Sequence, residues 1–275
     1  MRNEASLEAQ KQWNAKACGE LEGDKGTTEY FVKVEEDRYK QQSWMHDYFQ
    51  YDKYEGKKVL EIGVGQGTDL MQFAKSGAAC YGVDITDNHL LLTQRKFKLL
   101  GKKVHLIKVD AVQLPFSDNY LDCVYSFGVM HHIPEVEKVI AEAYRVLKPG
   151  GVFMFALYYK WSAFHLFWKL FAHGLRHRWL FTKGYDGLLA TIEDGADGVT
   201  IKPYVKLYTK KDVKRLLSKF VVKDISVHQL HPDHLWPPML SKLMEKWVLN
   251  LEQRLGWYVA CKAIKANNST LIDGE

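Results

Sequence analysis

The sequence predicts an α/β fold in which a seven-stranded, mostly parallel β-sheet carries helices on both faces. From Lys57 onward, short apolar runs rich in β-branched and aromatic residues alternate with longer helical stretches, a pattern typical of βαβ units. The runs are apolar almost throughout, as expected for strands buried on both faces. The first run also ends in a glycine-rich turn, "EIGVGQG", where a strand would pass into its helix.

Each apolar run predicts one strand, and each helical stretch predicts one helix. The predicted strands are residues 57–63, 79–85, 104–110, 121–128, 151–159, 222–230 and 256–264. The predicted helices are residues 69–77, 87–100, 135–147, 209–220 and 239–253. The helix of 209–220, "TKKDVKRLLSKF", is basic and amphipathic, and the elements after it extend the same sheet.

We expect a single domain, because 275 residues with 47% hydrophobic content can fill one sizeable core. Its predicted parts are a cover (1–50), a ligand-binding core (51–159), a lid insertion (160–205), a completion of the sheet (206–266) and a tail (267–275). The first twenty residues lack the apolar core of a secretory signal, so we expect a cytoplasmic protein. The four cysteines form no C-x-x-C pair, which argues against a disulfide framework or a thiolate zinc site.

The glycine turn indicates a ligand that approaches the main chain. Gly63, Gly65 and Gly67 allow positive φ angles and leave space beside the helix-start amides. A dinucleotide-binding G-x-G-x-x-G would need glycine at Thr68, and the G-K-[ST] of a phosphate loop is absent. Glu61 would repel a pyrophosphate and would suit a cationic amine. A purely structural tight turn is the alternative.

Two acids end the next two strands. Asp84 follows the glycine turn by about 20 residues, where a carboxylate can accept both hydroxyls of a ribose. Asp110 precedes the small residue Ala111, beside which a flat base could lie, with its amino group donating to Asp110. A helix cap and a strand-end turn are the respective alternatives.

Five motifs in order and register resemble the class I S-adenosylmethionine-dependent methyltransferases over residues 57–157. They are "EIGVGQG", "GVDIT", "KVDAVQLPF", "CVYSFGVMHHI" and "AYRVLKPGG". The resemblance implies a Rossmann-like fold that binds S-adenosyl-L-methionine and releases S-adenosyl-L-homocysteine. It implies the methionine part at Glu61, Gly63, Gly65 and Gly67, the ribose at Asp84, and the adenine at Asp110 and Ala111, with Ile85 and Phe127 also binding the cofactor.

The resemblance extends more loosely into the N-terminal segment. "WNAKACGE", "TEYF" and "EEDRYK" look like the cover of a bacterial branch of small-molecule methyltransferases. That likeness implies that Arg38 and Tyr39 lie against the cofactor. The alternative is an amphipathic helix with Tyr39 in the core.

The catalytic edge of the sheet carries a histidine pair and two tyrosines. Methyl transfer from a sulfonium is an in-line displacement that depends mainly on placing the acceptor, and a hydroxyl acceptor gains from a general base. His132, and less strongly His131, are therefore expected to remove a proton or to orient the substrate. Tyr158 and Tyr159 are expected to contact substrate through their hydroxyls, with packing as the alternative.

The insertion is predicted to form an amphipathic lid. Phe164, Trp168, Phe171 and Leu175 share one helical face, and we expect this face, with Trp168, to cover an apolar substrate. Peripheral membrane contact through residues 161–181 and a dimer face are the alternatives. Basic residues interrupt the segment too often for a membrane-spanning helix.

Two acidic loops complete the candidate site residues. "TIEDGADG" offers Glu193, and with it Asp194 and Asp197, to an amine substrate. "HPDHLWPP" gathers His231, Asp233 and His234 without a fourth ligand, so no metal is predicted.

The sequence therefore predicts methyl transfer to oxygen or nitrogen of a small, partly apolar molecule. The net charge of +5 is too small to indicate nucleic acid, and no RNA-binding module is recognisable. RNA methylation, methylation of a lipid-like substrate at a membrane surface and cofactor binding without catalysis remain alternatives.

Overall fold

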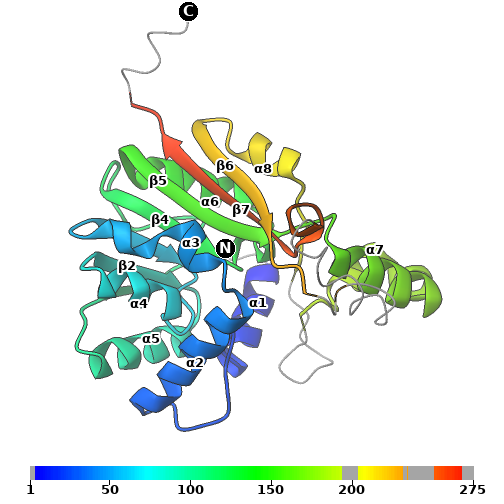
Figure 1. Ribbon diagram of the computed structural model, residues 1–275, viewed down its shortest axis with the longest axis horizontal. Coiled ribbons are helices and arrows are strands. Elements are labelled where there is room, and N and C mark those ends of the chain that lie inside the picture. Colours follow the sequence, from blue (N-terminus) through cyan, green and yellow to red (C-terminus); the bar gives the residue numbers. More distant parts are fainter. Residues whose placement is uncertain (1–3, 194–203, 232–233, 235–250, 268–275) are drawn as a thin grey trace, which may run out of the picture.

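A computed structural model describes residues 4–193, 204–231, 234 and 251–267. Seven strands form one sheet in the order β3-β2-β1-β4-β5-β7-β6 (Figure 1). The strands are β1 (Lys58–Ile62), β2 (Ala79–Asp84), β3 (His105–Lys108), β4 (Leu121–Phe127), β5 (Leu147–Tyr158), β6 (Phe220–His228) and β7 (Tyr258–Lys265). The first five strands pair in parallel, whereas β7 runs antiparallel to both β5 and β6. The mostly parallel seven-stranded sheet is confirmed.

Helices cover both faces of this sheet. They are α4 (Thr68–Lys75), α5 (Asp87–Leu99), α6 (Val136–Val146) and α8 (Lys210–Leu216). Because successive strand residues face opposite sides, Leu60 packs in one buried cluster with Ile140 of α6, and Val59 packs in the other with Phe73 of α4. Most of the helix expected at 239–253 lies outside the described residues. Residues 251–255, at the end of this stretch, are helical.

The N-terminal segment forms a helical cover, as predicted. It contains α1 (Glu4–Ala15), α2 (Thr28–Gln41), α3 (Met45–Phe49) and the short η1 (Tyr51–Tyr54). Thr27 caps α2 by accepting a hydrogen bond from the Tyr30 amide. Helix α1 contacts α5, and α2 contacts α4 and α5. Helix α1 is also hydrogen-bonded to Asp110 and to the Ile85 carbonyl, so the cover lies at the ends of β3 and β2.

The insertion forms η3 (Phe164–Arg176), a π-helix, and α7 (Trp179–Leu189), which pack on each other and project away from the sheet in Figure 1. The residues that η3 buries are His165, Lys169, Ala172 and Gly174. Phe171 and Leu175, by contrast, are 48% and 50% exposed. No helix among the described residues is long and apolar enough to cross a membrane.

The predicted apolar face is thus divided: Phe171 and Leu175 are exposed, whereas Phe164 packs against the core, and the covering of a substrate by this face stays a prediction. Hydrogen bonds from i to i+5 wind η3 differently from an α-helix, so the 3.6-residue periodicity misplaces its faces. Polar contacts also fix the opposite face of η3 against neighbouring backbone carbonyls. Lys169 Nζ donates to the Thr191 carbonyl at 2.7 Å, and His165 Nδ1 lies 2.6 Å from the Lys160 carbonyl oxygen.

Candidate active site

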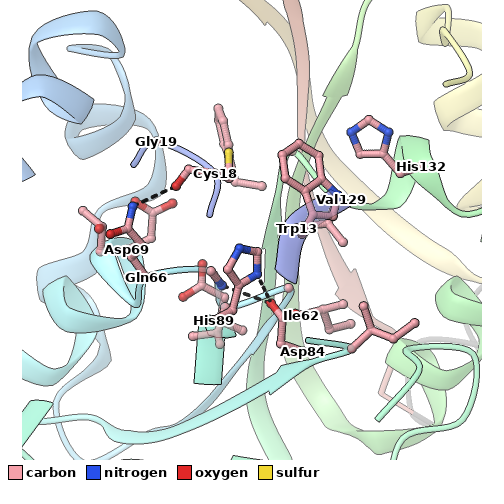
Figure 2. Close-up of a pocket in the computed structure, with 18 of the residues that line it drawn as sticks. Trp13, Cys18, Gly19, Ile62, Gln66, Asp69, Asp84, His89, Val129 and His132 are labelled. Atoms are coloured by element: carbon pink, nitrogen blue, oxygen red, sulfur yellow. Dashed lines mark hydrogen bonds and ion pairs between the residues drawn. The ribbon is translucent and has the colours of Figure 1, made fainter. Parts of the chain in front are cut away.

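A cavity of about 340 Å³ opens at the carboxyl ends of β1, β2 and β4. Its walls come from the turn after β1, the ends of the neighbouring strands, the N-terminal cover and three residues further along the chain, Tyr158, Glu193 and Tyr258. Figure 2 draws Trp13 of the cover between His132 and the pair formed by Asp84 and His89. Residues distant in sequence thus surround one space.

The glycines of the turn have different surroundings. All three adopt positive φ, between 55° and 73°. A Cβ on Gly63 would lie 2.2 Å from Val129, and one on Gly67 would lie 2.7 Å from Thr93. A Cβ on Gly65 would meet nothing within 4 Å. Gly63 and Gly65 line the cavity, whereas Gly67 does not and instead caps α4. Gly65 is therefore the position where open space remains for a ligand.

Glu61 places an unpartnered carboxylate oxygen at the cavity wall. The residue is 4% exposed, and its Oε2 has no hydrogen-bond partner among the described residues. Burial and the neighbouring charge of Asp69 hold the pKa of Glu61 well above its usual range. A cationic group bound here would favour the ionised carboxylate and would give this oxygen a partner.

Arg38 reaches the cavity through an ion pair that sequence reasoning missed. Its Nε lies 2.6 Å from Asp69 Oδ1, its Nη2 contacts Oδ2, and its guanidinium stands 4.7 Å from the Phe127 ring centroid. Burial alone would raise the pKa of Asp69, but Arg38 and the hydrogen bonds from Tyr125 and Tyr39 outweigh it and lower that pKa. Asp69 lies in the first turn of α4, two residues after Gly67. An acid at this place in the sequence was the signal that could have indicated the ion pair.

Tyr39 does not line the cavity. Its hydroxyl donates to Asp69 at 2.9 Å, and its ring packs against His46 and Tyr51. The core alternative therefore describes Tyr39 better than direct contact with a cofactor.

The Asp84 carboxylate is held by four hydrogen bonds. Oδ1 accepts from the Thr86 amide at 3.0 Å and the Thr86 hydroxyl at 2.8 Å, and Oδ2 accepts from the Gly65 amide at 3.2 Å. The fourth joins Oδ2 to His89 Nδ1 at 3.0 Å (Figure 2). Burial would raise the pKa of Asp84, but the bonds from His89 and Thr86 lower it overall.

His89 is a second cavity residue that the sequence did not reveal. Its side chain is buried, and its Nε2 has no partner among the described residues. Nδ1 is engaged by Asp84, so Nε2 is the ring nitrogen that remains for a ligand, and the Asp84 end of the cavity presents it beside the carboxylate. A histidine five residues after a strand-end acid is a weak signal, because most histidines on buried helix faces only pack.

The predicted adenine end is also closed by the cover. Asp110, Ala111 and Ile85 all line the cavity. Ser6 of α1 donates to Asp110 Oδ2 at 3.1 Å, and Gln10 donates to the Ile85 carbonyl at 2.9 Å. These bonds tie α1 to the ends of β2 and β3.

The opposite end of the cavity gathers His132, Tyr158 and Glu193. His132 Nδ1 lies 2.8 Å from the Tyr204 carbonyl oxygen and must donate to it, because a carbonyl only accepts. His132 Nε2 lies 3.9 Å from Glu193 Oε1, and the Tyr158 hydroxyl donates to the same oxygen. Burial lowers the pKa of His132, so its Nε2 carries a free lone pair at neutral pH.

His131 lies behind His132 and does not line the cavity. It is fully buried, and its ring stacks on Tyr158 with centroids 3.6 Å apart. Both of its ring nitrogens lack a partner among the described residues. Burial keeps the pKa of His131 well below its usual range, so the imidazole is neutral.

The remaining predicted site residues are not brought together here. Tyr159 is buried in the core, its amide bonded to the Trp257 carbonyl, and neither Tyr159 nor Trp168 lines the cavity. Asp194, Asp197 and Asp233 lie outside the described residues. The rings of His231 and His234 lie 5.3 Å apart, away from the cavity lining.

Residues 60–155 match the family described as "Methyltransferase domain". The chain is 38% identical to the sterol 24-C-methyltransferase of Pneumocystis carinii over 104 residues, 36% of this chain and 27% of that protein. It is 35% identical to phosphoethanolamine N-methyltransferase 2 of Caenorhabditis elegans over 107 residues, 38% of this chain and 24% of that protein. The match thus spans about a quarter of these relatives' length.

The whole fold has counterparts among solved structures. The magnesium protoporphyrin IX methyltransferase of Synechocystis with bound S-adenosylhomocysteine superposes with a TM-score of 0.60 at 13% identity, covering 96% of this chain and 100% of that one. The resemblance seen in the sequence is confirmed: residues 60–155 match the methyltransferase-domain family, and the chain as a whole shares the fold of this S-adenosylhomocysteine-bound methyltransferase.

Proposed function

We propose that the protein transfers the methyl group of S-adenosyl-L-methionine to an oxygen or nitrogen atom of a small, partly apolar molecule. The observation that carries this proposal is the single cavity that joins the glycine turn and Asp84 to His132, Tyr158 and Glu193. A cofactor at the first end would place its reactive carbon toward the second. The domain match supports the same reaction.

The residues of the first end suit this cofactor. The unpartnered oxygen of Glu61 would receive the ammonium of the methionine part, and the open space at Gly65 would admit its chain. Asp84 and His89 would take the ribose hydroxyls, and Asp110, Ala111 and Ile85 would surround the adenine. Arg38 and Phe127 would close the remaining wall.

The bound cofactor supplies an electrophilic methyl group, so the task of the chain is placement and exclusion of water. Trp13 and Cys18 of the cover line the same cavity as His132 and would flank a bound acceptor. His132 has its Nδ1–H fixed on the Tyr204 carbonyl, which directs its Nε2 lone pair to the acceptor end. There it would accept the proton of an acceptor hydroxyl or orient the acceptor.

The acceptor end combines aromatic and acidic groups. Trp13, Phe127, Tyr158 and Tyr258 provide apolar surface, and Glu193 and His132 provide the polar contacts. This mixture favours a small organic acceptor over a nucleic acid, which would call for a broad basic surface. The named relatives methylate sterols and phosphoethanolamine. The four unpaired cysteines support a reducing, cytoplasmic setting.

The direct test is transfer of labelled methyl groups. Purified protein is incubated with S-[¹³C-methyl]-adenosylmethionine and the small-molecule fraction of a cell extract, and products are identified by mass spectrometry. We expect a labelled product that disappears with the His132→Ala protein. Failure of the folded protein to bind either S-adenosylmethionine or S-adenosylhomocysteine in calorimetry would refute the proposal.

A second candidate is methylation of a lipid-like substrate at a membrane surface. The observation that favours it is the exposed apolar surface of the insertion, formed by Trp161, Phe171, Leu175, Phe181 and Tyr185. Phe181 is 73% exposed. Arg176 at the end of η3, Arg178 between the two helices and Lys183 on α7 are exposed as well, a combination that suits an anionic bilayer.

A further inference from the structure

The acceptor end holds three side chains whose arrangement is that of a metal-binding site. One ligand atom each from His131, His132 and Glu193 lies within 4.8 Å of the others, and both histidines are buried. We propose that these three side chains bind one divalent transition-metal ion, with Zn²⁺ as the best match to two imidazoles and one carboxylate. This site was not predictable from the sequence, because Glu193 lies some 60 residues from the histidine pair, and no metal was expected.

His132 is already oriented as a ligand. Its Nδ1–H is fixed on the Tyr204 carbonyl at 2.8 Å, so the other nitrogen, Nε2, presents its lone pair to Glu193. Metal-bound histidines characteristically donate their second ring N–H to a carbonyl or carboxylate in this way. Nε2 and Glu193 Oε1 are both acceptors, and at 3.9 Å they are too far apart to share a proton directly. A cation between them would satisfy both.

Glu193 and His131 lead to the same conclusion. Glu193 accepts a hydrogen bond from Tyr158, the outer contact expected of a ligating carboxylate, and no lysine or arginine in the described part of the chain forms an ion pair with it. His131 is fully buried with both ring nitrogens unpartnered among the described residues. Such an imidazole is costly to bury unless a ligand engages it. A metal ion would supply that ligand.

The geometry leaves a coordination position for another molecule. Ligand atoms around four-coordinate Zn²⁺, at bond lengths of about 2.0–2.2 Å, lie roughly 3.3–3.6 Å apart. The His132–Glu193 pair at 3.9 Å, and the His131 nitrogen within 4.8 Å of both, would therefore have to draw closer around the ion. His132 and Glu193 line the cavity, so the open position faces the acceptor end. The metal would then hold an oxygen or nitrogen of the acceptor and lower the pKa of a bound hydroxyl. In that case His132 orients the acceptor and does not remove its proton.

Cobalt spectroscopy tests the site without any methyl transfer. The tag-free, chelator-treated protein is titrated with Co²⁺ and followed by visible absorption, and Zn²⁺ binding is measured by calorimetry. We expect one ion per chain, four-coordinate cobalt bands, and at least a tenfold loss of affinity in His132→Ala, His131→Gln and Glu193→Gln. Tyr158→Phe, which removes only the outer contact, should weaken binding by about 10–100-fold while the protein stays folded.

The control is His105→Ala, because His105 is exposed on the edge strand β3, outside the cavity lining. It should bind the metal as the wild type does. Absence of stoichiometric binding by the folded wild type, or equal binding by Glu193→Gln and wild type, would overturn the metal site. Neither result bears on cofactor binding at Glu61 and Asp84, so this inference and the proposed function can fail separately.

Discussion

At the scale of single residues, the burial of Glu61 makes the binding of a cationic ligand depend on pH. Because its pKa is raised, the Glu61 carboxyl keeps its proton to higher pH than an ordinary glutamate, and binding of a cationic ammonium to the protonated form releases that proton. Cofactor affinity should therefore fall as the pH is lowered through the raised pKa of Glu61. Calorimetry of S-adenosylhomocysteine binding at several pH values, in buffers of different ionisation enthalpy, measures both effects. In Glu61→Gln the pH dependence should largely disappear; an unchanged pH dependence would exclude Glu61 as the ammonium partner.

The Asp84 and His89 pair makes a second prediction at this scale. Asp84→Ala removes an ionised acceptor and should weaken S-adenosylhomocysteine binding by on the order of 1.5–3 kcal/mol. His89→Phe keeps an aromatic ring but removes the unpartnered Nε2 and the bond to Asp84, so it should also weaken binding, by a smaller amount. Calorimetry gives both values, with thermal unfolding as the check on folding. Wild-type affinity in a folded Asp84→Ala protein would contradict the ribose assignment.

His132 should affect turnover and leave cofactor binding nearly intact. His132→Ala should lower turnover by roughly 10²–10⁴-fold, because the polar group facing the acceptor is lost. The rate is measured with the labelled product identified above, and S-adenosylhomocysteine affinity serves as the control. A loss smaller than tenfold would assign His132 to packing.

At the scale of elements, the strands and the helices between them were predictable, because each apolar run had to be buried on both sides of the sheet. The predicted helix 87–100, for example, is α5 over Asp87–Leu99, starting at its Thr86 cap. The faces of η3 were not predictable. Its π-helical winding and the burial of Lys169 against the Thr191 carbonyl follow from tertiary contacts that no local periodicity contains.

The cover gives a stability prediction for one element. Arg38→Met leaves the buried, ionised Asp69 without its cation, so it should destabilise the protein by about 3–5 kcal/mol. Urea unfolding of the variant and the wild type measures the difference. Asp37→Asn, on the same helix, changes a charge without touching that pair and serves as the control. A cost below about 1 kcal/mol would mean that the pair does not anchor α2.

The exposed apolar surface of the insertion gives a prediction that tests whether the protein binds a membrane surface. The wild-type protein should sediment together with vesicles of phosphatidylglycerol and phosphatidylcholine. The bound fraction should decrease as the salt concentration is raised. The double variant with Phe171→Ser and Phe181→Ser should stay in the supernatant, because both side chains belong to the exposed apolar surface. Leu91→Ser is the matched control, since Leu91 is 63% exposed on α5. If all three proteins sediment equally with the vesicles, or if the wild type does not sediment with them, methylation at a membrane surface is excluded.

At the scale of the whole molecule, the two ends of the cavity differed in how far the sequence could predict them. Residues of the cofactor end mostly follow consecutive strands, and parallel strands bring their carboxyl ends to one edge, so Glu61, Asp84 and Asp110 could be placed together in advance. The acceptor end joins Trp13, His132 and Glu193 from segments far apart in the chain. Only the packing of the cover and the insertion brings those segments together.

A crystal structure of the protein with S-adenosylhomocysteine would show whether this cavity is the cofactor site. We predict the ligand in the 340 Å³ cavity, with its ammonium at Glu61, its ribose at Asp84 and His89, its adenine beside Asp110 and Ala111, and its sulfur directed toward His132. Density for the ligand outside this cavity, or an empty cavity in crystals grown at a saturating ligand concentration, would contradict the account.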